Sequence, residues 1–219
     1  LTGPKSRAIL AKVCDADLSL PWLTHQTTQI AGRPCQLVRV SFAGELGWEV
    51  HARDADMPEI CDAIIAGGAK PFGMWALNSL RLEKGYKAWK GDLSTDYTIL
   101  QGGLERFVDW AKPEFRGKAA LEAEKQRGVA KRFCTLVIEA GEQDPPYMST
   151  IWHNGQVVGE LTSGYYGHRV GACIGLGMLK SEVNVAGTAV EVEIFGTRYP
   201  AVVQEDQPLW DAKNERIRA

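Results

Sequence analysis

The chain has 219 residues, of which 45% are apolar and 24% are charged, and its formal net charge is −2. This charge gives no electrostatic reason to expect nucleic acid or an anionic membrane as a partner, and no apolar run approaches the roughly 20 residues of a membrane span. The five cysteines lie at least 21 residues apart, which indicates reduced thiols in a cytosol-like compartment rather than a disulfide framework or a metal site.

The N-terminal part of the chain begins with a turn followed by a short amphipathic helix, KSRAILAKV, expected over residues 5–13. The passage from Asp15 to Pro34 is polar and rich in turn residues, with a strand expected at Thr27 to Ile30. His25 has no ligand-type neighbour in this passage. We therefore assign His25 to a surface or structural role.

The segment from Gln36 to Arg53, QLVRVSFAGELGWEVHAR, predicts two strands joined by a tight turn. Leu37 to Phe42 is a β-rich run, the AGELG string supplies two glycines for positive φ, and Trp48 to Ala52 resumes extended structure. Glu49 is unusual because it stands in a strand that should have one buried face, where an unpaired charge is costly. Residue type alone favours a solvent-facing glutamate.

Two helices are expected after this hairpin. Asp54 or Asp56 could cap the first, from Pro58 to Ala66. The second, from Met74 to Lys84, contains the string SLRLE. We interpret this string as structural support for the hairpin, with a solvated or ion-paired helix face as the alternative.

The pattern changes at Gly128, where a helix that begins within FRGKAALEAEKQRG ends and strand-like alternation begins. Five β-like runs follow, and Asn154-Gly155 is a type I′ hairpin dipeptide. We therefore expect an α/β region over residues 1–128 and a small antiparallel barrel over residues 129–219. The glycines lack the strand, G-x-G-x-x-G and helix order of a dinucleotide site.

The string RVSFAGELGWEV resembles the hairpin that is typical of the aminomethyltransferase family, the glycine cleavage T-protein and its relatives. The resemblance continues through SLRLE and the barrel string GELTSGYYGHRVGACIGLG, and it covers essentially the whole chain. It implies an α+β fold with ferredoxin-like α/β units followed by a small antiparallel β-barrel. Because the family's leucine-x-glycine-proline segment lies well inside its first domain, we expect an N-terminally truncated T-protein fold.

The resemblance also implies tetrahydrofolate as the cofactor and aminomethyl or formaldehyde transfer as the reaction. The family's counterpart of Glu49 binds the pterin ring, where a buried carboxylate can accept two donors in a charge-assisted pair. The family's catalytic aspartate is expected upstream of Leu1, so no catalytic residue is expected in this chain, and no metal ligand. The further expected cofactor-binding positions are Phe42, His51, Leu77 and Arg106.

Two departures bear on the kind of enzyme, because T-proteins carry an arginine where this chain has Leu77 and a tyrosine where it has Phe42. The strings ALNSLRLEKGYKAW and GDLSTDYT are more similar to the folate-binding C-terminal region of dimethylglycine and sarcosine dehydrogenases. We therefore expect a folate module that receives a one-carbon unit from a small N-methyl or aminomethyl donor.

In those enzymes a separate flavin domain oxidises the donor, so an upstream FAD domain is the expected partner. The expected location is cytoplasmic, or the mitochondrial matrix in a eukaryote.

The alternatives to this function are a stand-alone T-protein-like aminomethyltransferase or demethylase, and a non-catalytic folate-binding assembly factor. The assembly factors typically carry K-G-C-x-x-G-Q-E, and KGYKAWKG here lacks both the cysteine and the acid.

Overall fold

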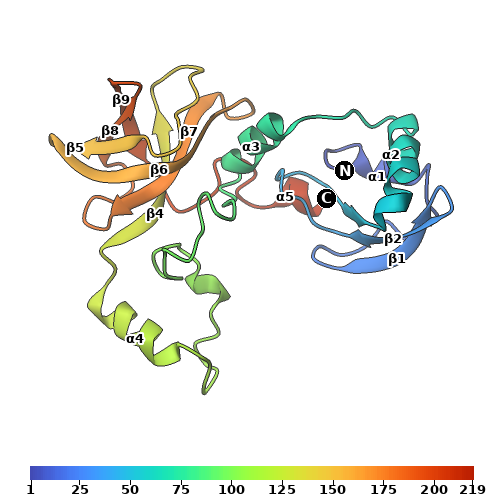
Figure 1. Ribbon diagram of the computed structural model, residues 1–219, viewed down its shortest axis with the longest axis horizontal. Helices are drawn as coiled ribbons and strands as arrows, with labels where there is room; N and C mark the ends of the chain where they lie inside the picture. Colours follow the sequence, from blue (N-terminus) through green and yellow to red (C-terminus); the bar gives the residue numbers. More distant parts are fainter. The chain divides into compact units, whose positions relative to one another are not determined.

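The computed structural model describes all residues from 1 to 219. The chain forms two compact units, one built from Leu1–Lys84 with Trp210–Ala219 and the other from Gly85–Leu209 (Figure 1). Each unit has its own hydrophobic core. The expected class, α+β with a barrel, is confirmed. The predicted boundary at Gly128 lies inside the second unit and stays a prediction as the junction between the α/β and barrel regions.

The first unit contains a three-stranded antiparallel sheet in the order β1-β2-β3. Its helices α1 and α2 lie on one side of the sheet (Figure 1), where Leu10 and Ile60 join Leu37 and Trp48 in the core. The elements are α1 (Ser6–Leu10), β1 (His25–Ile30), β2 (Arg33–Val38), β3 (Glu49–His51), η1 (Asp54–Asp56), α2 (Met57–Ala66), α3 (Met74–Glu83) and α5 (Glu215–Arg218).

The predicted hairpin is confirmed as the β2–β3 pair, in which Val38 lies opposite Glu49, but the predicted tight turn is wrong. The chain from Arg39 to Trp48 forms a longer irregular connection. Gly44 has the expected positive φ of 70°. Gly47 does not need a positive φ; a Cβ there would lie 2.9 Å from the carbonyl oxygen of Leu1, so this glycine permits close backbone approach.

The predicted aspartate cap of α2 is also wrong. Neither η1 nor α2 receives a side-chain cap hydrogen bond. Asp56 is buried and accepts a hydrogen bond from Arg53 Nε at 2.8 Å. The carboxylate of Asp56 therefore forms an ion pair with Arg53 and does not cap the free backbone amides at the start of the helix.

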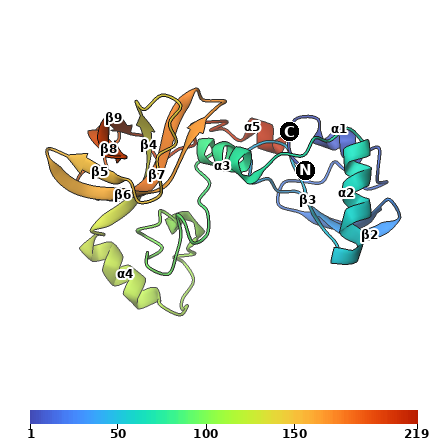
Figure 2. The ribbon, with the colours of Figure 1, turned by 45° about the horizontal axis from the view of Figure 1, so that its top comes forward.

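The second unit contains a closed barrel in the order β4-β7-β6-β5-β8-β9 (Figure 2). Pairing of β4 with β9, as at Leu136 and Val203, closes it. Asn154 and Gly155, with φ of 50° and 73°, make the predicted hairpin turn. The strands are β4 (Lys131–Ile138), β5 (Thr150–His153), β6 (Gln156–Gly167), β7 (Ala172–Lys180), β8 (Ala189–Ile194) and β9 (Thr197–Val203).

The part of the second unit that precedes the barrel is largely irregular. It contains only the short helix η2 (Glu105–Phe107) and the helix α4 (Lys118–Arg127), which ends at Gly128 as expected. None of the helices in the chain is long and apolar enough to cross a membrane.

Candidate functional site

Strand alternation decides where Glu49 points. Trp48 is only 1% exposed and Val50 packs against the same core, so Glu49 and His51 project from the opposite face of the sheet. The side chains of these two residues are 54% and 59% exposed. The resemblance implied a buried carboxylate, but the carboxylate of Glu49 is exposed in this chain. Its role as a ligand anchor stays a prediction.

The position of Trp48 is held by a buried arginine. The guanidinium of Arg39 lies 4.8 Å from the Trp48 ring centroid, a distance at which cation–π attraction operates. Arg39 also donates to the Gly47 carbonyl at 3.0 Å. Burial, and then the nearby charge of Arg7, lowers the pKa of Arg39. These contacts fix the residue before Glu49, and therefore the face from which Glu49 projects.

The exposed face of the sheet carries two hydrogen-bonded polar pairs. His51 Nε2 lies 3.1 Å from Glu49 Oε2. On the neighbouring strands, Gln36 Nε2 lies 2.9 Å from His25 Nδ1. Val38, which is half-buried, pairs with His25 on one side and with Glu49 on the other. In the row of Val38, the face opposite the helices is therefore polar on both sides and apolar in the middle.

The other expected cofactor-binding positions are more scattered. Phe42 lies in the β2–β3 connection and is 40% exposed. Leu77 is half-buried on α3. Arg106 is exposed on η2, with its guanidinium 4.8 Å from the Phe107 ring, and belongs to the second unit. Of the five expected residues, the structure brings Glu49 and His51 into direct contact.

The SLRLE string supports the β2–β3 connection through the residue that follows it. Arg81, Glu83 and Lys84 are at most 2% exposed, so the solvated form of the alternative is wrong, and the ion-paired form stays a prediction. A Cβ on Gly44 would lie 3.0 Å from the Lys84 side chain, which shows how closely the lysine packs beneath this connection.

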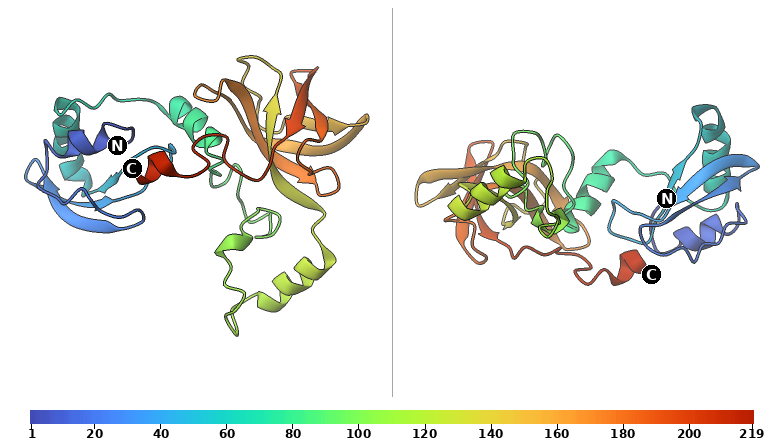
Figure 3. Two further views of the ribbon diagram at one scale, coloured as in Figure 1. Left: turned by 180° about the vertical axis from the view of Figure 1, so that it is seen from behind. Right: turned by 90° about the horizontal axis from the view of Figure 1, so that it is seen from below.

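The ammonium of Lys84 pairs with Asp211 Oδ2 at 3.2 Å. Asp211 in turn accepts the backbone amide of Arg216 at 3.1 Å, and Arg39 donates to the Ile217 carbonyl at 3.0 Å. These contacts hold α5 and the C-terminal residues within the first unit (Figure 3). Sequence reasoning missed this anchor, because its partners lie more than 100 positions apart in the chain.

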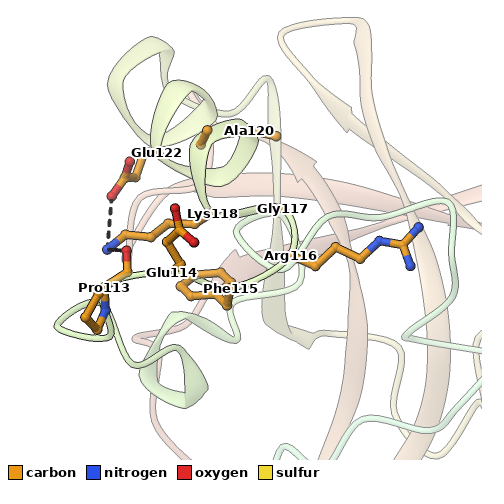
Figure 4. Close-up of a pocket in the computed structure, with 9 residues that line it drawn as sticks. Pro113, Glu114, Phe115, Arg116, Gly117, Lys118, Ala120 and Glu122 are labelled. Carbon is orange, nitrogen blue, oxygen red and sulfur yellow. Dashed lines mark hydrogen bonds and ion pairs between the residues drawn. The ribbon is translucent and has the colours of Figure 1, made fainter.

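An open hollow in the second unit lies at the start of α4, and Figure 4 shows the residues that line it, from Pro113 to Glu122. Lys118 occupies this region with its own contacts, donating to the Lys112 carbonyl at 2.7 Å and lying 3.7 Å from Glu122. None of the expected cofactor-binding residues lines the hollow. We therefore place the candidate site on the exposed face of the sheet.

The arrangement of an α/β unit and an antiparallel barrel is the fold of the glycine cleavage T-protein. The crystal structure of the aminomethyltransferase T of the glycine cleavage system from Bartonella henselae matches with a TM-score of 0.85 and 23% identity, over 96% of this chain and 58% of that one.

Sequence models identify the family. The GCVT N-terminal domain model matches residues 1–112, and the model of the glycine cleavage T-protein C-terminal barrel domain matches residues 131–211. The chain belongs to the glycine cleavage T-protein (aminomethyltransferase) family. Gly128 falls between the two matched ranges.

Proteins with similar sequences include dehydrogenases and aminomethyltransferases. Human mitochondrial dimethylglycine dehydrogenase is 35% identical over 100% of this chain and 26% of its own length. The aminomethyltransferase of Thermosynechococcus vestitus is 32% identical over 93% of this chain and 56% of its own length. The chain thus spans about a quarter of the dehydrogenases and little more than half of the aminomethyltransferases that it matches.

Proposed function

We propose that this protein binds tetrahydrofolate and acts in one-carbon transfer, as the folate module of an enzyme that resembles dimethylglycine and sarcosine dehydrogenases. The observation that carries the proposal is the position of Glu49 on the exposed face of the sheet in a chain of this family. The match to both dehydrogenases extends over 100% of the chain, which supports this choice of relatives.

The chemistry of the face suits a pterin. An ionised carboxylate only accepts hydrogen bonds. One oxygen of Glu49 is engaged by His51, and the side chain as a whole is 54% exposed. A pterin edge presents ring N–H and amino donors side by side, which such a carboxylate can bind in a charge-assisted pair. When bound, tetrahydrofolate would supply the ring nitrogens that carry the one-carbon unit. Glu49 would orient the ring, and His51 would hold the carboxylate.

The other expected residues have supporting roles in this proposal. Phe42 and Leu77 would offer apolar contact to the ligand, and the exposed guanidinium of Arg106 would suit a carboxylate on it.

The donor would be a small N-methyl or aminomethyl compound, with a flavin domain as the partner that oxidises it. The mitochondrial location of the dehydrogenase relatives supports a matrix location in a eukaryote and a cytoplasmic one otherwise.

Titration of tetrahydrofolate by calorimetry tests the anchor. Glu49→Ala should weaken binding by about 2–4 kcal/mol, or roughly 30- to 1000-fold in Kd, because two ligand donors lose their acceptor. Glu59→Ala is the matched control, since Glu59 is also 54% exposed and ion-paired, but it lies on α2. Equal affinities for the two variants would remove the anchor assignment.

A stand-alone aminomethyltransferase is the second candidate, favoured by the match to 56% of the Thermosynechococcus vestitus enzyme. The two candidates differ in the oxidation step, because only the dehydrogenase kind carries its own flavin domain. A dinucleotide-binding G-x-G-x-x-G domain in the same reading frame would favour the dehydrogenase, and a frame without one would favour the transferase.

A further inference from the structure

We propose that His25, held by Gln36, is a second ligand-binding group on the sheet face that carries Glu49, and that it donates a hydrogen bond to the folate ring from the side opposite the carboxylate. The inference rests on the proposed function, because it takes Glu49 as the first anchor. It assigns a binding role to a histidine that the sequence places in a polar, turn-rich passage.

The register of the sheet sets the spacing. His25 pairs with Val38, and Val38 pairs with Glu49, so the three side chains form one row across the sheet on the same face. Because neighbouring strands lie about 4.8 Å apart, His25 and Glu49 are separated by about 10 Å at the backbone. Val38 lies between them as a half-buried apolar floor. This row can receive a flat bicyclic ring that lies over Val38 with one edge towards each polar side chain.

The hydrogen bonds determine which group donates. The amide nitrogen of Gln36 donates to His25 Nδ1 at 2.9 Å, so the neutral imidazole keeps its proton on Nε2 and presents a donor there. On the other side, Glu49 is an acceptor, and His51 Nε2 donates to it. The face therefore offers an acceptor on β3 and a donor on β1.

A pterin has the complementary pattern. Its amino and ring N–H donors share one edge, while its carbonyl oxygen and further ring nitrogens can accept hydrogen bonds elsewhere on the ring. Helices α1 and α2 cover the other face of the sheet, so His25 and Glu49 are not needed to complete the core. Polar groups that are paired, exposed and held in register on an uncovered face suit binding better than packing.

Calorimetric titration of tetrahydrofolate into the full chain and its variants tests the inference. We expect His25→Ala to weaken binding about 5- to 20-fold, the effect of one lost hydrogen bond. The matched control is Gln29→Ala, another exposed β1 residue on the same face, two side chains further from the row; its Kd should stay within about twofold of the wild-type value.

Gln36→Leu completes the test, because it removes the contact that fixes the His25 tautomer. It should weaken binding by less than His25→Ala does, and the double variant should bind no more weakly than His25→Ala alone, as expected for coupled neighbours. Thermal unfolding of each variant should match the wild type, since all three residues are exposed or half-exposed.

The outcomes separate the two proposals. If Glu49→Ala weakens binding and His25→Ala behaves like Gln29→Ala, the role of His25 is overturned and the proposed function stands. If His25→Ala weakens binding but the effects of His25→Ala and Gln36→Leu simply add, the tautomer argument is wrong. If the wild-type chain does not bind tetrahydrofolate, the proposed function fails, and the inference fails with it.

Discussion

Asp92 in the second unit and Glu49 in the first unit stand in opposite environments. In the second unit Asp92 is 0% exposed, and protein donors surround it: Thr162 Oγ1 at 2.6 Å, Ser163 Oγ at 2.8 Å and the amide of Ala88 at 2.7 Å. In the first unit Glu49 is 54% exposed and accepts a hydrogen bond from His51. Protein donors thus satisfy the buried carboxylate of the second unit, whereas the carboxylate on the sheet of the first unit stays accessible to solvent.

The two environments differ because the barrel is closed, whereas the three-stranded sheet is covered on one face only. The barrel has no free edge, and all its strands have a neighbour on both sides. A bulge in β6 between Leu161 and Ser163 lets two successive hydroxyls reach Asp92. The three-stranded sheet has helices on one face only. A polar group on the uncovered face costs little when exposed, so that face can keep groups for binding.

Removal of the buried carboxylate should have the largest effect. Asp92→Ala should lower the free energy of unfolding of the second unit by about 3–5 kcal/mol, because several buried donors lose a charged acceptor. Urea denaturation followed by circular dichroism measures this effect. Asp96→Ala in the same segment, where an exposed carboxylate accepts from Ser94, and Glu49→Ala should each change stability by less than about 0.5 kcal/mol. A loss for Glu49→Ala as large as that for Asp92→Ala would abolish the contrast.

A smaller, pH-dependent effect is expected within the first unit at Asp211. Burial alone would raise the pKa of Asp211, but hydrogen bonds from the Arg216 amide, the Lys84 ammonium and the Ile217 amide together lower it. Because the pKa of Asp211 is lowered in the folded state, its carboxylate contributes to the free energy of unfolding above the unfolded pKa of about 4. This contribution is lost as the pH falls through the folded pKa.

Asp211→Asn should therefore cost about 1.5–3 kcal/mol of stability near neutral pH and much less in acid, where the wild-type carboxyl is protonated too. Denaturation of both proteins between about pH 7 and pH 3 follows the difference. Asp62→Asn, an exposed carboxyl on α2, serves as the control. A cost that stays constant with pH would contradict the assignment of the ion pair with Lys84.

The smallest effect on stability is expected at the cysteines, where the two units differ in reactivity. All five thiols are free. In the barrel, burial raises the pKa of Cys134 and of Cys173 to about 12, so both remain protonated and shielded at about pH 8. Cys61 on α2 is exposed and should react first with a thiol reagent; Cys61→Ala should change stability by less than about 0.5 kcal/mol. Peptide mapping after labelling identifies the modified sites, and equally fast labelling of Cys134 would show that the barrel opens readily.

Local patterns predicted the regular elements well. Alternation in the C-terminal part, the Asn154-Gly155 dipeptide and the helix end at Gly128 depend on residues within a few positions of one another, and the structure has the barrel strands, the turn and the helix end there. Predictions that depended on distant partners were less successful. Position 47 needs a glycine because a Cβ there would lie too close to the carbonyl oxygen of Leu1. Asp56 pairs with the guanidinium of Arg53 and does not cap the helix amides.

The same distinction applies to the candidate site. The family resemblance and the period of the strand were enough to single out Glu49 and His51, because both lie in one strand and alternation places them on one face. Strand pairing alone brings His25 and Gln36 onto that face, and chain folding alone brings Lys84 to Asp211. Hydrogen bonds between strands and buried ion pairs join residues that are far apart in the sequence, so these neighbours are set by tertiary packing and not by any local pattern.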